Sequence, residues 1–265
     1  MPLSAVLLVL ASTVLHAGWN ARLHRGSDPE VVIALAYLFV GIVLVPAAVV
    51  DPPREVLGWV LASSVSQGLY MGLLGSAYRA GSLGVAYPIS RGTAPLLIGF
   101  GGWLLLDETP SLATVVGLVV LVFGLLSLAG VGTQRQERRA VVLAAVTGLC
   151  TVAYSLIDAH SVDLTGAMGY LSVVMVLSSL GVLAVRRPAM ARIRPMFGQS
   201  VLVGLGQGGA YGLVLLAFQQ AQAGQVSGLR QVSVVLGVLI ARESLGPRAM
   251  WGAVMVTLGA GLVVW

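Results

Sequence analysis

The sequence is poor in charge. Charged residues make up 9% of the 265-residue chain, whereas apolar residues make up 57% and the mean hydropathy is +0.95. An ordinary soluble domain is about one quarter charged. Lysine is absent, so all fifteen basic residues are arginines. This composition excludes a soluble fold of this length and predicts a membrane protein.

Several chemical motifs are also missing. Cys150 is the single cysteine, which excludes an internal disulfide or thiol pair. The sequence has no zinc-type His-Glu spacing and no phosphate-binding Gly-Lys loop. We therefore expect no enzyme activity, no cofactor and no metal. The arginines do not gather on one polar face among aromatic residues, so we expect no nucleic-acid partner either.

Instead, the arginines punctuate apolar runs of the length that a bilayer requires. The runs predict ten transmembrane helices and leave no room for a soluble domain. The run over Met1–Ala17 resembles the core of a signal peptide but lacks a basic segment before it, so we interpret it as the first helix. The ten predicted helices cover residues 4–21, 31–50, 56–77, 83–105, 111–131, 140–160, 165–185, 198–219, 225–241 and 248–265.

The two halves of the chain repeat. An offset of 135 residues places Gly117 on Gly252 and Gly124 on Gly259, and an offset near 140 places Gln67 on Gln207. Each half holds an odd number of helices, so the second half enters the membrane inverted. The prediction is an all-α membrane protein with a five-plus-five inverted repeat around a central cavity. Its parts are residues 1–131, a linker over 132–139, and residues 140–265.

The arginines also predict the orientation. The odd-numbered connections carry twelve of them, whereas the even-numbered connections carry only Arg54. The positive-inside rule places the odd connections in the cytoplasm and both termini outside, in a bacterial-type cytoplasmic membrane. The lipid bilayer is thus one partner, and the sequence leaves open whether the protein is a monomer or a homodimer.

Several motifs resemble a known family. They are His16-Ala17-Gly18-Trp19-Asn20, the run from Gly81 to Pro88, Pro95, Leu106-Asp107-Glu108-Thr109, and Arg230 with Ser233 and Val234. Together they resemble EamA-type members of the drug/metabolite transporter superfamily, as two tandem units. The resemblance implies a ten-helix basket that opens alternately to each side and carries small metabolites or drugs.

Arg91 and Arg230 are the two arginines that fall inside predicted helices. A guanidinium group is costly in a bilayer unless an anion or carbonyl groups meet it. We expect both to bind an anionic group of a small-molecule substrate. Alternatively, Arg91 pairs with Asp158 or caps carbonyls near Pro88 and Pro95, and Arg230 snorkels to the headgroups. The seven-residue spacing of the two prolines favours a hinge.

Other polar and aromatic residues are candidates for the cavity wall. His16 titrates near neutral pH and is a candidate for proton coupling, or else a hydrogen-bonded packing residue. Asp158 lies near the outer end of its helix, where we expect it to be solvated. The remaining candidates, which bind substrate or alternatively anchor and pack the helices, are Trp19, Asn20, Gln67, Tyr87, Tyr154, Gln207 and Tyr211.

The sequence therefore favours a secondary transporter that exports a small anionic or zwitterionic metabolite by alternating access. Two other classes stay open: an intramembrane lipid-modifying enzyme that uses His16 and Asp158, and a non-transporting membrane scaffold. The glycine pairs at Gly117 and Gly124 and at Gly252 and Gly259 predict close helix packing within or between protomers. Glu108 and Glu243 are expected to end helices at the interface or, alternatively, to form a gating salt bridge.

Overall fold

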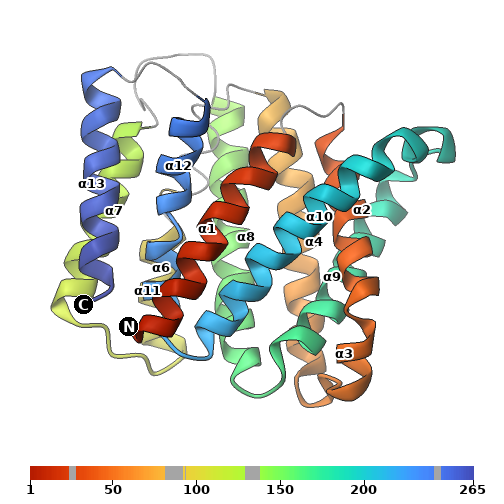
Figure 1. Cartoon of the computed structure of the whole chain (residues 1–265), viewed down its shortest axis with the longest axis horizontal. Helices are drawn as coiled ribbons and strands as arrows, with labels where there is room; N and C mark the ends of the chain where they lie inside the picture. Colours follow the sequence, from red (N-terminus) through yellow and green to blue (C-terminus); the bar gives the residue numbers. More distant parts are fainter. Residues whose placement is uncertain (24–27, 81–91, 93, 129–137, 242–245) are drawn as a thin grey trace.

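The structure is a computed structural model that describes residues 1–23, 28–80, 92, 94–128, 138–241 and 246–265. In these ranges every regular element is a helix (Figure 1). The first half contains α1 (Leu3–Leu23), α2 (Pro29–Val43), α3 (Val45–Val50), the short 3-10 helix η1 (Arg54–Val56), α4 (Leu57–Ala80), α6 (Ala94–Leu105) and α7 (Leu112–Leu128). The second half contains α8 (Arg138–Val162), α9 (Ala167–Arg186), α10 (Met190–Phe218), α11 (Ala223–Leu229), α12 (Val232–Ala241) and α13 (Pro247–Val263).

Helix lengths and surfaces fit a bilayer. Five helices carry apolar stretches of at least 18 residues, long enough to cross a membrane, and four shorter helices are also apolar. Large apolar side chains such as Leu69, Phe123 and Leu205 are more than half exposed on the outside of the molecule. On a soluble protein, an apolar surface of this kind would promote aggregation, whereas in a bilayer it contacts lipid. The chain is an integral membrane protein.

Three predicted helices differ from the observed ones. The predicted helix 31–50 divides at Leu44, and α3 begins at Val45 with Pro46 in its first turn, because proline cannot donate a backbone hydrogen bond. The predicted helix 225–241 divides at Arg230 and Gln231. Finally, α10 begins at Met190 rather than near 198, and it continues through Pro195 inside the helix.

The α7 and α13 helices pack through reciprocal glycines. A Cβ atom on Gly117 would lie 2.8 Å from the carbonyl oxygen of Gly259, and a Cβ on Gly259 would lie 2.6 Å from that of Gly117. Gly124 and Gly252 have the same relation, at 2.9 and 2.8 Å. These pairings require antiparallel helices whose backbones touch. The glycine pairs predicted from the sequence therefore pack within one chain.

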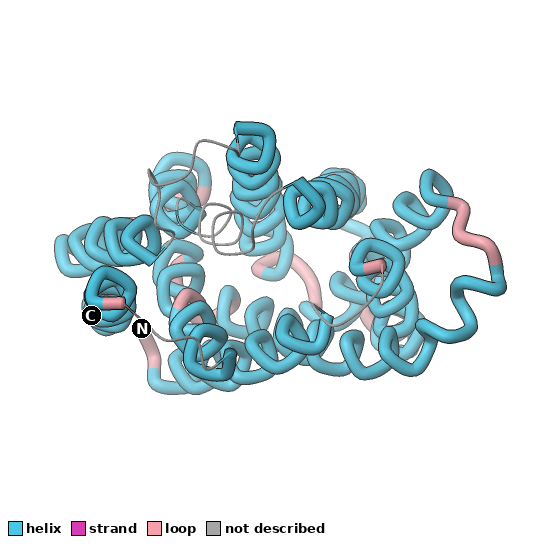
Figure 2. Tube along the Cα trace, turned by 90° about the horizontal axis from the view of Figure 1, so that it is seen from above, coloured by secondary structure: helices cyan, strands magenta, loops and turns pink. Residues whose placement is uncertain are grey.

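The other helices contact one another across the two halves. The α1 helix packs on α10, and α4 packs on α8. The α2 helix lies against both α9 and α10, while α6 meets α11 where Gly99 approaches Gly224. Figure 2 shows these helices end-on, side by side. The termini meet on one face of the molecule, where the Met1 ammonium donates a hydrogen bond of 2.7 Å to the carbonyl of Val264.

Candidate functional site

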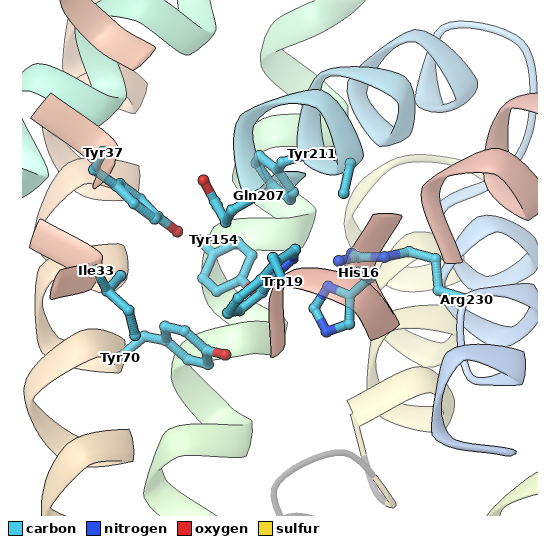
Figure 3. A pocket seen from close by; sticks show the side chains of 10 residues that line it. His16, Trp19, Ile33, Tyr37, Tyr70, Tyr154, Gln207, Tyr211 and Arg230 are labelled. Carbon is cyan, nitrogen blue, oxygen red and sulfur yellow. The ribbon is translucent and has the colours of Figure 1, made fainter. Parts of the chain in front are cut away.

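A small pocket lies where helices of both halves converge. Its wall comes from α1, α2 and α4 of the first half and from α8, α10 and the α11–α12 junction of the second (Figure 3). The open space at its centre is about 20 Å³, which is room for one water molecule. A metabolite therefore enters only if the helices move apart. The lining residues are His16, Trp19, Ile33, Tyr37, Tyr70, Tyr154, Gln207, Ala210, Tyr211 and Arg230.

Arg230 reaches this pocket from an interruption between two helices. The α11 helix ends at Leu229, and α12 begins at Val232. Arg230 is 8% exposed, and its guanidinium carbon lies 5.6 Å from the ring centroid of Tyr211. Figure 3 shows the guanidinium pointing toward His16. The alternative of an arginine that snorkels to the headgroups is wrong, because the side chain is buried inside the protein.

Aromatic rings form most of the remaining wall. Tyr154 makes edge-to-face contacts with Tyr70 on one side and Tyr211 on the other, with ring centroids 5.8 and 5.9 Å apart. His16 makes a similar contact with Trp19, at 4.8 Å. Such contacts fix the orientation of the rings. The pocket thus offers a rigid aromatic surface beside one cationic group.

Two polar atoms in this wall have no protein partner within the described part of the chain. They are the indole Nε1 of Trp19, a donor, and the amide oxygen of Gln207, an acceptor. Both side chains are 7% exposed. Buried polar groups are nearly always hydrogen-bonded, because leaving one unpaired costs about 1–3 kcal/mol. The pair is therefore suited to a ligand or water that both accepts and donates hydrogen bonds.

Asp158 on α8 lies beside the pocket, at the centre of a buried network. Ser63 donates to one carboxylate oxygen at 2.5 Å and Tyr170 at 2.6 Å, while Gln67 donates to the other at 3.2 Å. Tyr211 also donates to that second oxygen. Asp158 is completely buried, so the expectation of a solvated carboxylate is wrong. The end of α8 is covered by α4, α9 and α10, and a helix boundary in the sequence does not reveal that cover.

Comparison with known proteins agrees with a membrane transporter. Residues 3–130 match the model of the EamA-like transporter family. These residues make up just under half of the chain. The match indicates similarity to membrane transporters of the drug/metabolite transporter superfamily, in agreement with the motifs in the sequence. No curated protein matches the chain. A solved crystal structure, described only as that of a protein, is similar in fold, with a TM-score of 0.77, 18% sequence identity, and coverage of 99% of this chain and 96% of the other.

The fold brings together six of the residues that the sequence proposed for the site. His16, Trp19, Tyr154, Gln207 and Tyr211 all line the pocket beside Arg230, which completes the set. Gln67 and Gln207, which the repeat places at equivalent positions, have different surroundings. Gln67 does not line the pocket and donates hydrogen bonds to Asp158 and Ser63 instead.

The other proposed residues lie apart from the pocket or cannot be placed. Asn20 is half-buried and is not part of the wall. Pro95 is the second residue of α6 and is buried. Arg91, Tyr87 and Pro88 lie outside the described residues. Tyr37 and Tyr70 were missed by the sequence, since nothing distinguishes them there from tyrosines that anchor a helix at the interface.

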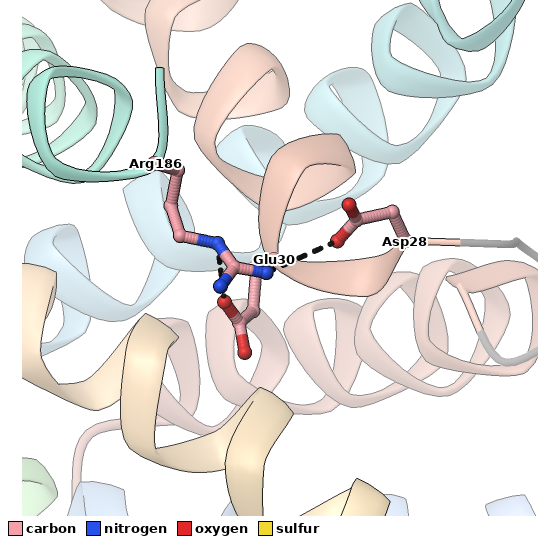
Figure 4. A network of polar contacts seen from close by, with 3 residues as sticks. All are labelled: Asp28, Glu30 and Arg186. Carbon is pink, nitrogen blue, oxygen red and sulfur yellow. Dashed lines mark ion pairs between the residues drawn. The ribbon is translucent and has the colours of Figure 1, made fainter. Parts of the chain in front are cut away.

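A second polar cluster joins α2 to α9. The Arg186 Nε lies 3.0 Å from the Glu30 carboxylate, and another guanidinium nitrogen lies 3.9 Å from that of Asp28 (Figure 4). Glu30 is 2% exposed. The ion pair thus holds the first turn of α2 against the last turn of α9. This pairing could not be predicted from the sequence, because the two residues are distant in the chain and each resembles a charge at the membrane interface.

Glu108 caps the start of α11. Its carboxylate accepts a hydrogen bond of 2.6 Å from the backbone N–H of Ala223. Burial raises the pKa of Glu108, while the backbone N–H groups of Ala223 and Gly224 oppose the shift. The expectation that Glu108 ends its own helix at the interface is therefore incomplete, because its side chain serves a helix of the other half. The alternative, a gating salt bridge with Arg242, concerns a residue outside the described ranges, as do the expectations for Glu243.

Proposed function

We propose that this EamA-like protein is a secondary transporter that exports a small zwitterionic or anionic metabolite by alternating access. The observation that supports it best is the pocket between the halves, where a buried arginine stands beside an unpaired donor and an unpaired acceptor. A metabolite with a carboxylate and an N–H group complements all three. Arg230 would bind the carboxylate, since a guanidinium group pairs with both of its oxygens.

The same chemistry assigns roles to the other polar atoms. Gln207 offers its amide oxygen to the N–H group of the substrate, and Trp19 offers its indole N–H to an acceptor. Tyr154 and Tyr211 would pack on the apolar part of the molecule. We keep Arg91 as a second anion-binding residue, since its position in the repeat corresponds to that of Arg230.

Alternating access rests on the inverted repeat, with units over 1–131 and 140–265 and ten helices in all. The helix contacts support it, because they occur in pairs that a two-fold rotation would exchange: α1 on α10 matches α4 on α8, and α2 on α10 matches α9 on α4. The antiparallel α7 and α13, paired through equivalent glycines, would lie on the rotation axis itself.

The orientation follows from the same architecture. Both termini lie on one face. The exposed arginines Arg22, Arg187 and Arg248 lie at the opposite ends of their helices, so we place those ends in the cytoplasm and the termini outside a bacterial-type cytoplasmic membrane.

Counterflow into proteoliposomes tests the proposal. Vesicles are loaded with unlabelled solute and then offered labelled L-phenylalanine, hydrocinnamate or phenethylamine, which carry both charged groups, the carboxylate alone or the amine alone. Accumulation of the first, or of the first two, with no chemical change is the expected result. Chemical conversion would indicate an enzyme. Absence of accumulation for these and for smaller amino acids and hydroxy acids would contradict the proposed substrate class.

A further inference from the structure

Asp158 is a buried acidic residue that lies beside the substrate pocket but does not line it. Its carboxylate is completely buried in the protein, on the fifth-last residue of α8. The donors to it come from three other helices: Ser63 and Gln67 from α4, Tyr170 from α9 and Tyr211 from α10. Within the described residues, the salt bridges that the structure forms do not include it. A buried carboxylate without a cationic partner is costly to keep charged.

The network around Asp158 accommodates a neutral carboxyl group as well as a carboxylate. Three of the four donors are hydroxyl groups, and a hydroxyl group either donates or accepts a hydrogen bond. When Asp158 takes up a proton, rotation of one hydroxyl hydrogen turns that donor into an acceptor. The heavy atoms need not move. This property distinguishes the network from one built of arginine or backbone N–H groups, which only donate.

Tyr211 connects this network to the substrate pocket. Its hydroxyl group donates to Asp158, and its ring lines the pocket beneath Arg230. The titratable and charged groups that face this region from the packed elements are His16 on α1, Tyr37 on α2, Tyr70 on α4, Tyr154 on α8, Tyr170 on α9, Tyr211 on α10 and Arg230. A negative charge that enters the pocket therefore changes the electrostatic environment of Asp158.

The network also spans the two halves of the chain. Ser63 and Gln67 belong to the first half, whereas Asp158, Tyr170 and Tyr211 belong to the second. Any rocking of one half against the other would pull two donors away from the carboxyl group and admit water. The proton affinity of Asp158 then differs between the closed and the open state, because hydrogen bonds to a carboxylate favour its charged form.

We propose that Asp158 is an exchangeable proton-binding site that couples transport to proton movement. The step needs no co-reactant: a carboxylate oxygen takes a proton from water on one side of the membrane and returns it to water on the other. The proposal rests on the proposed transport function. It differs from coupling through His16, which lines the pocket itself.

The first test requires no substrate. Purified protein is titrated from about pH 5 to about pH 9, and infrared difference spectroscopy follows the carbonyl stretch of protonated carboxylic acids. The wild type should show a titrating band that is lost in Asp158→Asn. The matched control, Asp163→Asn, removes an exposed carboxylate five residues along the chain and should keep the band. Because burial also raises the pKa of Glu108, the deciding quantity is the difference between the wild type and Asp158→Asn, and an undiminished titrating absorption in Asp158→Asn would overturn the site.

The second test measures coupling. Proteoliposomes that contain an internal pH-sensitive dye are exposed to a gradient of L-phenylalanine. The wild type should move protons with the amino acid, whereas Asp158→Asn should exchange L-phenylalanine without proton movement and without a pH dependence. Proton movement that survives in Asp158→Asn but is lost in His16→Gln would overturn the proposal in favour of His16. If the wild type moves no L-phenylalanine, the proposed substrate fails while the infrared titration still decides the proton site.

Asp158 accepts hydrogen bonds from four side chains, so Asp158→Asn can destabilise the fold, and a second variant is needed. Asp158→Glu retains the acidic group and serves as the second variant. Should Asp158→Asn not yield folded protein, the infrared band must shift in Asp158→Glu, since the carboxyl group then sits one carbon further from its donors. An unshifted band would assign the titration to another residue and contradict the proposal.

Discussion

The guanidinium carbon of Arg230 lies 5.6 Å from the ring centroid of Tyr211, and both side chains are more than nine-tenths buried. Since Tyr211 also bonds Asp158, this contact joins a cation, an aromatic ring and a carboxyl group from one half of the chain. Tyr211 therefore connects the pocket wall to the proposed proton site. Each can be perturbed separately.

The reciprocal glycine packing of α7 and α13 predicts a large effect of one methyl group. In Gly259→Ala, the new Cβ would lie 2.6 Å from the Gly117 carbonyl oxygen, which is backbone and cannot turn aside. We expect a loss of about 1–3 kcal/mol, as for overpacked cores, and a lower melting temperature in detergent. Gly261→Ala is the matched control, because nothing lies within 4 Å of its Cβ position. Equal melting temperatures for the two variants would disprove the close contact.

The Glu108 cap predicts a stability difference between two substitutions. Glu108→Ala removes the acceptor for the Ala223 N–H and should lower stability by about 0.5–2 kcal/mol, the usual cost of a lost helix cap. Glu108→Gln retains an oxygen acceptor, so it should lose less stability than Glu108→Ala at every pH. Thermal unfolding of both variants checks this. A glutamine variant as unstable as the alanine variant would show that the hydrogen bond to α11 contributes little.

The same residue predicts the direction of a pH effect. Burial raises the pKa of Glu108 above its ordinary 4.5, so its contribution to stability is fully present below pH 4.5 and is lost as the pH rises through the folded value. Glu108→Gln, which cannot ionise, should therefore gain stability relative to the wild type as the pH rises toward neutrality. Melting temperatures measured across that range provide the test. A relative loss would mean that the carboxylate is favoured in the folded state.

The Glu30–Arg186 ion pair should contribute modestly. Glu30 is buried, but the Arg186 side chain is 40% exposed, so solvent screens the attraction. A double-mutant cycle with Glu30→Gln and Arg186→Gln should give a coupling energy on the order of 1 kcal/mol. Increasing the salt concentration should reduce it. Strict additivity of the two substitutions would show that the pair does not hold α2 against α9.

The orientation predicts which face of the membrane carries the termini. A cysteine appended after Trp265, in a Cys150→Ser background, should react in intact cells with a membrane-impermeant thiol reagent. A cysteine at Arg187, at the opposite end of α9, should react only after the cells are opened. The reverse pattern would place the termini in the cytoplasm and invert the proposed topology.

Much of the fold follows from the sequence because the bilayer restricts it. Apolar runs of fixed length, arginines between them and glycines at fixed offsets can all be read from the sequence, and they predicted most of the helix ranges and the glycine packing faces of α7 and α13. The breaks at Leu44 and Arg230 are harder to predict from the sequence, since each concerns a single turn inside an apolar run.

The candidate site could be predicted only in part from the sequence. Arg230, Trp19 and Gln207 could be proposed because polar and cationic groups are rare inside a span. Asp158 was misjudged, since its burial depends on α4, α9 and α10, which lie 12 to 95 residues away at the donors concerned. The Tyr37 and Tyr70 contacts likewise depend on how separate helices cross, which no local pattern records.

The role of Arg230 in holding a carboxylate is the central claim, and one counterflow comparison tests it. Wild-type proteoliposomes should accumulate L-phenylalanine and exclude phenethylamine, which lacks the carboxylate. Arg230→Gln should lose at least about tenfold in L-phenylalanine accumulation, equivalent to 1.4 kcal/mol, and Arg230→Lys should fall between, since lysine keeps the charge without the paired donors. The exposed Arg192→Gln is the control and should behave as the wild type. Unchanged accumulation and unchanged discrimination in Arg230→Gln would contradict the account.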